Sequence, residues 1–182
     1  MHLRRGEQRA ADFLKLNPQA LVPALVDGAT VLTQSLATIE YLDESHPDRP
    51  LLPNTAEGRA RVRALSQIVA CEIHPLGNLR VLQYLAKDLK QDEPTVQRWF
   101  NHWIALGFAA FEALIAGHRE TGAFCHGDQP TLADICLVPQ VFNAKRYDLD
   151  VTPYPTLMRI FEHCMAQPAF DRAQPAKQPD AE

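Results

Sequence analysis

The chain has 182 residues, 46% of them hydrophobic and 22% charged, which is typical of a globular protein with one large domain or two small ones. A formal net charge of −4, with no run of basic residues, gives no electrostatic case for nucleic-acid binding. No apolar run reaches the ~18 residues of a membrane span. Four widely spaced cysteines without a C-x-x-C pair favour free thiols in the cytoplasm over a disulfide or zinc framework.

The first part of the chain predicts a helix followed by a β-hairpin. Residues 7–16 carry apolar side chains at helical spacing, and the helix should end before Asn17-Pro18, because a residue that precedes proline avoids the α region. Two β-prone runs, 24–26 and 30–33, flank Asp27-Gly28-Ala29. An Asp-Gly pair between such runs is a strong hairpin signal.

Directly after the hairpin, Gln34-Ser35 open a stretch of periodic apolar residues that predicts a helix to about Ser45. Free N–H groups and the helix dipole favour an anion at such a helix start, so this corner is a candidate carboxylate site. Ser35 also suits a plain helix cap. Pro23 marks a strand entry, and from spacing alone it is either a turn proline or the second residue of a cis peptide bond.

Three prolines in the polar stretch 47–56 predict a linker, and long helices follow it. Apolar residues recur at three- and four-residue intervals from Val62 to Leu85, with Pro75 expected to interrupt the helix. A second helix is predicted over about 93–118, with Val96, Leu106, Ala110 and Leu114 in its apolar pattern. Its aromatic residues Trp99, Phe100 and Trp103 are expected in the core.

Thr131 and Asp134 stand three residues apart before an apolar run, which is the pattern of a capping box. Their predicted role is structural, since such a box helps to start a buried helix. A last helix is expected over about 154–167. The residues therefore predict an α/β unit over 1–46, a linker over 47–56 and an all-α unit over 57–182.

Several motifs together resemble the zeta class of glutathione S-transferases, which includes the maleylacetoacetate and maleylpyruvate isomerases. They are N-P-x-x-x-V-P-x-L, D-G, Q-S, L-L-P, I-x-P-x-x-N, T-L-A-D-I-C-L-V-P-Q-V and D-x-T-P-Y-P, spread from about residue 11 to the tail. The resemblance implies an α+β fold of two domains, with a partial thioredoxin-like unit followed by an all-helical domain. It also implies a homodimer.

The same resemblance implies a site for the cofactor glutathione in the first unit. Val22 would precede a cis Pro23 and hold the cysteinyl part through its backbone. Gln34 and Ser35 would hold the γ-glutamyl end, with Gln19 nearby.

For the helical unit, the resemblance implies contacts with a small dicarboxylic keto acid. His74 and Asn78 would line the cleft from the interrupted helix, and Arg146 could reach a substrate carboxylate. Each has an alternative role: His74 could face water at the helix interruption, and Arg80 and Arg146 could be solvated surface charges.

The resemblance has a gap at the front of the chain. Members of the class begin with a strand and a helix that carry a thiol-activating serine motif, and Met1–Leu3 would correspond to the end of the second strand. We therefore expect a truncated relative and identify no catalytic residue.

The leading functional prediction is glutathione-dependent cis–trans isomerisation of maleylacetoacetate or maleylpyruvate in aromatic catabolism. A general glutathione transferase and a non-catalytic binding module on the same scaffold are the alternatives.

Overall fold

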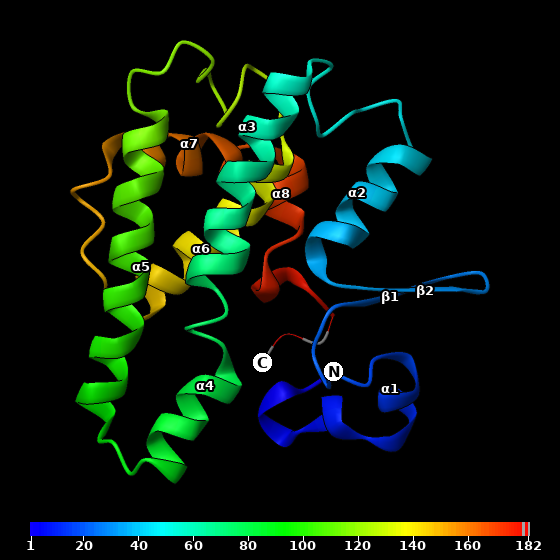
Figure 1. Cartoon of the computed structure of the whole chain (residues 1–182), viewed down its shortest axis with the longest axis vertical. Coiled ribbons are helices and arrows are strands. Elements are labelled where there is room, and N and C mark those ends of the chain that lie inside the picture. The colour runs from blue at the N-terminus through cyan, green and yellow to red at the C-terminus, as the bar shows by residue number, and fades with distance from the viewer. Residues whose placement is uncertain (180, 182) are drawn as a thin grey trace. The chain divides into compact units, whose positions relative to one another are not determined.

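The computed structural model describes residues 1–179 and 181 (Figure 1). The chain divides into two compact units, one formed by Met1–Pro50 with Ala173–Glu182 and the other by Leu51–Arg172. The linker over 47–56 stays a prediction. Within the described part of the chain, no helix has the length and apolar character needed to cross a bilayer.

The first unit contains the predicted hairpin and the helix after it. Strand β1 (Ala24–Asp27) pairs antiparallel with β2 (Thr30–Thr33), and the turn between them consists of Gly28 and Ala29. Gly28 has a φ of 58° at the first central position, where a type II′ turn requires glycine. Helix α2 (Ser35–Ser45) follows with the predicted bounds.

The start of the chain differs from its prediction. Helix α1 spans only Ala11–Leu16, and two 3₁₀ turns, Leu3–Arg5 and Glu7–Arg9, come before it. Met1–Leu3 do not form the expected strand end, because the sheet of the described residues consists of β1 and β2 alone. A strand needs a hydrogen-bonded neighbour, and neither β1 nor β2 pairs with this segment.

The second unit begins with the predicted interrupted helix. Helix α3 (Ala56–Gln67) is capped by Thr55, whose Oγ1 accepts the Gly58 N–H at 3.0 Å. A π-helical segment, Ile68–Ile73, leads into the turn at Pro75, and helix α4 (Leu79–Gln83) continues into a second π-helical segment, Tyr84–Asp88. The interruption at Pro75 is confirmed, whereas the π-helical segments had no sequence signal.

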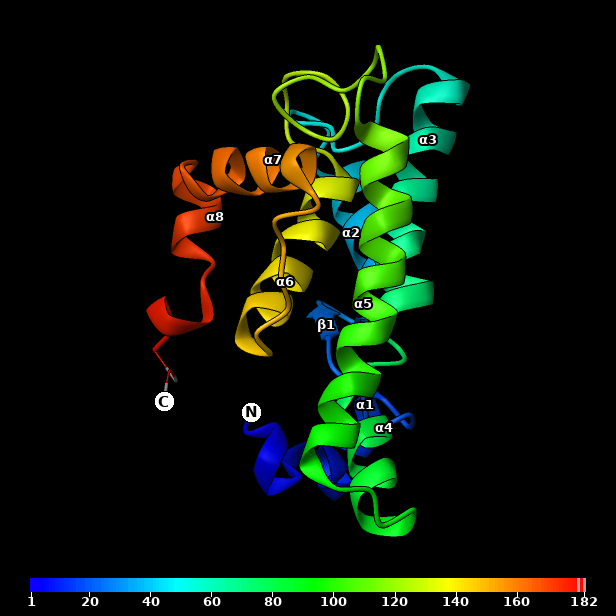
Figure 2. The same cartoon turned by 90° about the vertical axis from the view of Figure 1, so that its left-hand side faces the viewer.

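Helix α5 (Glu93–Ile115) is the long helix of this unit, and Figure 2 shows it extending beside α3 and α4. The prediction that aromatic residues of this helix lie in the core is confirmed for Phe100, which is 4% exposed, whereas Trp99 and Trp103 are half-buried. The buried stripe runs along one face of α5 at helical spacing, and Leu106 and Leu114, 54% and 50% exposed, lie outside it. Its members are Phe100, Ile104, Phe108, Phe111 and Ile115.

Three helices complete the unit: α6 (Leu132–Arg146), α7 (Pro155–Met165) and α8 (Pro168–Arg172). Helix α6 packs against α3 and α7, and α7 also packs against α5. The backbone N–H groups at the start of α7 donate hydrogen bonds to a side chain of another helix. The Glu112 carboxylate of α5 accepts the N–H groups of Thr156 at 2.9 Å and Leu157 at 2.7 Å. A 3₁₀ turn, Pro175–Lys177, lies near the end of the chain.

Candidate functional site

The predicted glutathione-binding residues of the first unit come together around the entry to the hairpin. The Val22–Pro23 peptide bond is cis, as the resemblance implied, and Val22 is 44% exposed. Among the described residues, no hydrogen bond uses the Val22 N–H or C=O. The backbone at Val22 therefore offers one donor and one acceptor to a ligand.

Gln34 and Gln19 meet beside the start of α2. The Gln34 Nε2 donates to the Gln19 Oε1 at 2.9 Å, and both side chains are exposed. Gln34 has a φ of 71°, an unfavourable value for a residue with a side chain. Such a conformation outside glycine is a recurring feature of functional sites.

The interpretation of Ser35 as a helix cap is wrong in detail. Gln34 occupies the cap position, and Ser35 is the first residue of the helix. The Gln34 side chain makes no capping hydrogen bond, so the first N–H groups of α2 receive none from it. Ser35 is exposed at this helix start, where an anionic group is favoured.

Asn17 shapes the loop that carries Gln19 and Val22, a role that the sequence interpretation missed. It is 2% exposed, its Nδ2 donates to the Leu21 carbonyl at 2.7 Å, and its Oδ1 accepts the Gln19 N–H at 3.0 Å. An asparagine that bonds the backbone two residues further on is a common turn device. The Asn-Pro pair was the available signal, but it predicted only the end of a helix.

The predicted substrate residues lie in the second unit, on three of its elements. His74 follows the π-helical segment and has an exposed side chain. The protein packed around part of the imidazole lowers its pKa, an effect that a hydrogen bond with Gln140 partly offsets. His74 is therefore expected to be neutral at pH 7.

Asn78 and Arg146 mark the two other elements. Asn78 caps α4, and its Oδ1 accepts the Arg80 N–H at 3.2 Å. Arg146 is exposed at the last turn of α6, and its guanidinium lies 5.7 Å from the centre of the Tyr147 ring.

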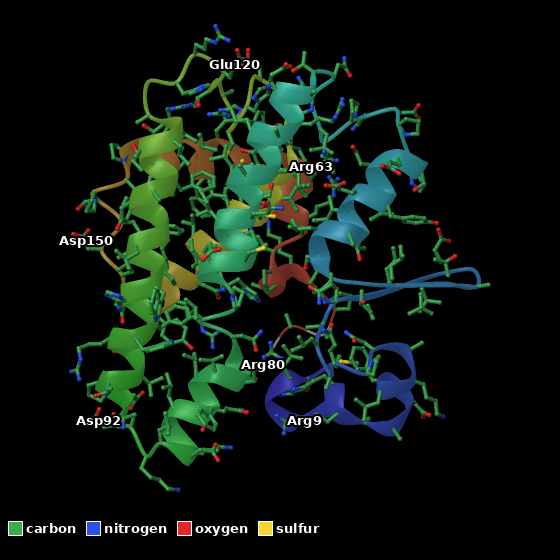
Figure 3. The ribbon with its side chains drawn as sticks, in the orientation of Figure 1. Arg9, Arg63, Arg80, Asp92, Glu120 and Asp150 are labelled. Atoms are coloured by element: carbon green, nitrogen blue, oxygen red, sulfur yellow. The ribbon has the colours of Figure 1, made fainter. Side chains whose placement is uncertain are left out.

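The position of Arg80 makes it a candidate for binding a carboxylate, which its sequence did not indicate. It is exposed in the first turn of α4, two residues after Asn78 (Figure 3). Among the described residues, its guanidinium makes no hydrogen bond or ion pair. A cation in this state can accept a carboxylate ligand without first losing a protein partner.

Thr131 and Asp134 form the predicted capping box, in a fully buried cluster. The Asp134 carboxylate is 0% exposed and accepts the Thr131 N–H at 2.8 Å and the Thr131 hydroxyl at 2.7 Å. It also accepts the Cys125 N–H at 2.8 Å. These bonds keep a buried carboxylate satisfied, so the geometry fits a structural role.

Comparisons with known proteins agree with this architecture. The glutathione S-transferase N-terminal domain model matches residues 2–45, and the C-terminal domain model matches residues 93–163. A maleylpyruvate isomerase of a Ralstonia species is 50% identical over 181 residues, which cover 100% of this chain and 85% of that protein.

Two solved structures are similar along the whole chain. One, described as the holo structure of a maleylpyruvate isomerase of the zeta class, has a TM-score of 0.97 at 50% identity and is matched over 85% of its length. The other, a maleylacetoacetate isomerase of Methylobacterium extorquens AM1 with bound malonate and glutathione, has a TM-score of 0.96 at 38% identity and is matched over 86%.

The fold and the two domain matches define a glutathione-transferase-like protein. Within that class, the high identity over the whole chain shows that it belongs to the zeta-class glutathione S-transferase family of maleylpyruvate and maleylacetoacetate isomerases.

Proposed function

We propose that the protein is a glutathione-dependent cis–trans isomerase of a small dicarboxylic keto acid, maleylpyruvate or maleylacetoacetate. The observation that carries this proposal is the exposed corner at Val22, Gln34 and Ser35, which has the polar groups that a γ-glutamyl peptide needs. The 50% identical relative with maleylpyruvate isomerase activity in its name supports the choice of reaction.

In this proposal, the first unit holds glutathione. The free N–H and C=O of Val22 would hold the cysteinyl backbone, as a neighbouring strand would. The start of α2 at Ser35 would hold the γ-glutamyl carboxylate, with Gln34 and Gln19 as amide partners. When bound, glutathione supplies the thiolate that adds reversibly to the cis double bond.

The second unit holds the keto acid. Arg80 and Arg146 are exposed cations suited to the two carboxylates, and Asn78 holds the backbone of Arg80 at the first turn of α4. The His74 imidazole, which is hydrogen-bonded to Gln140, adds a polar group on the same turn. The malonate bound by the Methylobacterium relative is a dicarboxylate, which supports this substrate class.

The assembly and location belong to the same proposal. We infer a homodimer, in keeping with the family, and a reducing cytoplasmic location. The four free cysteines support the location, because thiols persist in reducing compartments.

The test measures isomerisation and conjugation side by side. The protein is expected to convert maleylpyruvate or maleylacetoacetate to the trans isomer only when glutathione is added. Conjugation of chlorodinitrobenzene without any isomerisation would contradict the proposal and favour a general transferase.

A further inference from the structure

We propose that Trp99, Gln97 and Asn101 of α5 are positioning residues for the dicarboxylate. They hold the backbone of two segments: the α4 turn (residues 74–80) and the α6 end (residues 144–147). The inference rests on the proposed function, because these segments carry His74, Asn78, Arg80 and Arg146.

The first contact fixes the α4 turn. The Trp99 Nε1 donates to the Leu76 carbonyl at 2.9 Å, and Leu76 lies midway between His74 and Asn78. The next residue, Gly77, lies so close to the Phe100 ring that an added Cβ would meet it at 2.7 Å. The turn therefore packs against α5 at close range, and a displacement of this backbone moves the residues on both sides of it.

The second contact fixes the α6 end. The Gln97 Nε2 and the Asn101 Nδ2 both donate to the Tyr147 carbonyl, each at 3.0 Å. Tyr147 directly follows Arg146, and its ring stacks on Phe100 with the centroids 3.9 Å apart. Two side chains one helical turn apart thus hold the same carbonyl oxygen.

Both contacts come from a short stretch of α5, residues 97–101. Phe100 lies between the two segments, because one part of its ring faces Gly77 and the ring also stacks on Tyr147. The three donors all end on main-chain carbonyls, so they set where the two segments lie without occupying the side chains of His74 or Arg146. This stretch therefore holds both segments in one fixed relation.

A purely structural role is the alternative, since the last carbonyls of any helix need partners. Trp103 gives a matched control. It is half-buried on the same helix, 5.5 Å from Trp99 between ring centroids, and its buried Nε1 has no partner among the described residues. Trp99→Phe removes a used N–H group, whereas Trp103→Phe removes an unused one.

The expected result separates the two substrates. Trp99→Phe should raise the KM for the dicarboxylate about 5- to 10-fold and leave the KM for glutathione within about twofold, because a misplaced contact weakens only its own ligand. Trp103→Phe should change neither KM. Equal dicarboxylate KM values for the two variants, or an equal rise in both KM values for Trp99→Phe, would overturn the proposal.

The shared carbonyl provides a second test. Gln97→Met and Asn101→Leu each remove one donor, and the remaining donor still holds the Tyr147 carbonyl. Each single variant should therefore change the dicarboxylate KM only slightly. The double variant should raise this KM about 10-fold, which is more than the product of the two single effects. A double variant with an unchanged dicarboxylate KM would contradict the proposal.

Binding of malonate, measured by calorimetry, distinguishes a failure of the proposed function from a failure of the positioning role. If the wild type fails to isomerise but Trp99→Phe weakens malonate binding relative to Trp103→Phe, the proposed function fails and the positioning role stands. If the wild type isomerises and all variants bind malonate equally, the positioning role alone fails. A wild type that neither isomerises nor binds malonate overturns both.

Discussion

The Asp134 cluster and the glutathione corner at Val22 and Gln34 use polar groups in opposite ways. Asp134 is 0% exposed, and its two carboxylate oxygens accept three hydrogen bonds from Cys125 and Thr131. At the corner, the Val22 backbone groups make no hydrogen bond within the described chain, and Gln34 adopts a φ of 71°.

The difference shows which polar residues serve the fold and which serve a ligand. A buried carboxylate without partners would cost several kcal/mol, so the Asp134 cluster must be complete in the protein alone. An exposed corner with open donors costs little, since water satisfies them until a ligand arrives. Substitutions at the first should change stability, and those at the second should change binding.

Asp134→Ala should have the largest effect of all. It leaves the N–H groups of Thr131 and Cys125 and the Thr131 hydroxyl without an acceptor, for a loss of about 3 to 5 kcal/mol in the free energy of unfolding. Urea unfolding measures it. Asp150→Ala is the control, because the exposed Asp150 bonds the N–H and hydroxyl of Thr152 only locally. Similar losses for both variants would contradict the distinction.

Alkaline pH should lower the free energy of unfolding through buried thiols near the Asp134 cluster. Burial, with a smaller contribution from the Asp134 charge, raises the pKa of Cys164 from 9.0 to about 12. Above pH 9 the unfolded Cys164 thiol therefore loses its proton while the folded one keeps it, and this group alone lowers the free energy of unfolding by about 1.4 kcal/mol per pH unit until the folded pKa is reached.

Unfolding curves between pH 9 and 11 test this. Over that range, Cys164→Ala should lose about 2 to 3 kcal/mol less of its free energy of unfolding than the wild type loses. Cys71→Ala, which removes an exposed thiol, is the matched control. An unchanged slope for Cys164→Ala would be the contrary result.

Gln34 should show binding and stability moving in opposite directions. Gln34→Gly relieves the unfavourable φ and should raise the free energy of unfolding by up to about 1 kcal/mol. The same change removes the amide partner of glutathione and should weaken binding by about 1 to 3 kcal/mol, as should Gln34→Ala. Calorimetry and urea unfolding measure the two effects. A Gln34→Gly variant that binds glutathione like the wild type would remove Gln34 from the site.

Arg146→Ala should have the smallest effect of these variants. It should alter the KM for the dicarboxylate and not the KM for glutathione. Loss of an exposed cation that contacts a carboxylate should raise the dicarboxylate KM about 5- to 10-fold, or about 1 kcal/mol, with the glutathione KM unchanged. Arg119→Ala, which removes a side chain 90% exposed, is the control. An unchanged dicarboxylate KM would exclude Arg146 from the site.

The local elements with strong sequence signals were the ones that could be predicted. The hairpin turn depends on Gly28, helix α2 begins where its polar pair stands, and the capping box forms between Thr131 and Asp134, because each depends on neighbours in sequence. The cis bond before Pro23 followed from the resemblance, since its spacing alone left a turn proline open.

Contacts between distant segments could not be predicted. Nothing near Trp99 in the sequence indicates that its N–H reaches Leu76 while that of Trp103 has no partner. Which side of α5 is buried depends on the helices packed against it, so the apolar pattern alone did not show that Leu106 is exposed while Phe108 is buried. The same holds for Arg80, whose open guanidinium is a property of the surrounding structure.

The central claim, that glutathione and the dicarboxylate use different units of the chain, is tested most directly by amide NMR spectra recorded during two titrations. Glutathione should shift the amide signals of Val22, Gln34 and Ser35, and malonate should shift those of Asn78, Arg80 and Arg146. The buried Thr131 and Asp134 amides should stay unchanged in both titrations. Glutathione that shifts the second set and leaves Val22 and Gln34 in place would contradict the claim.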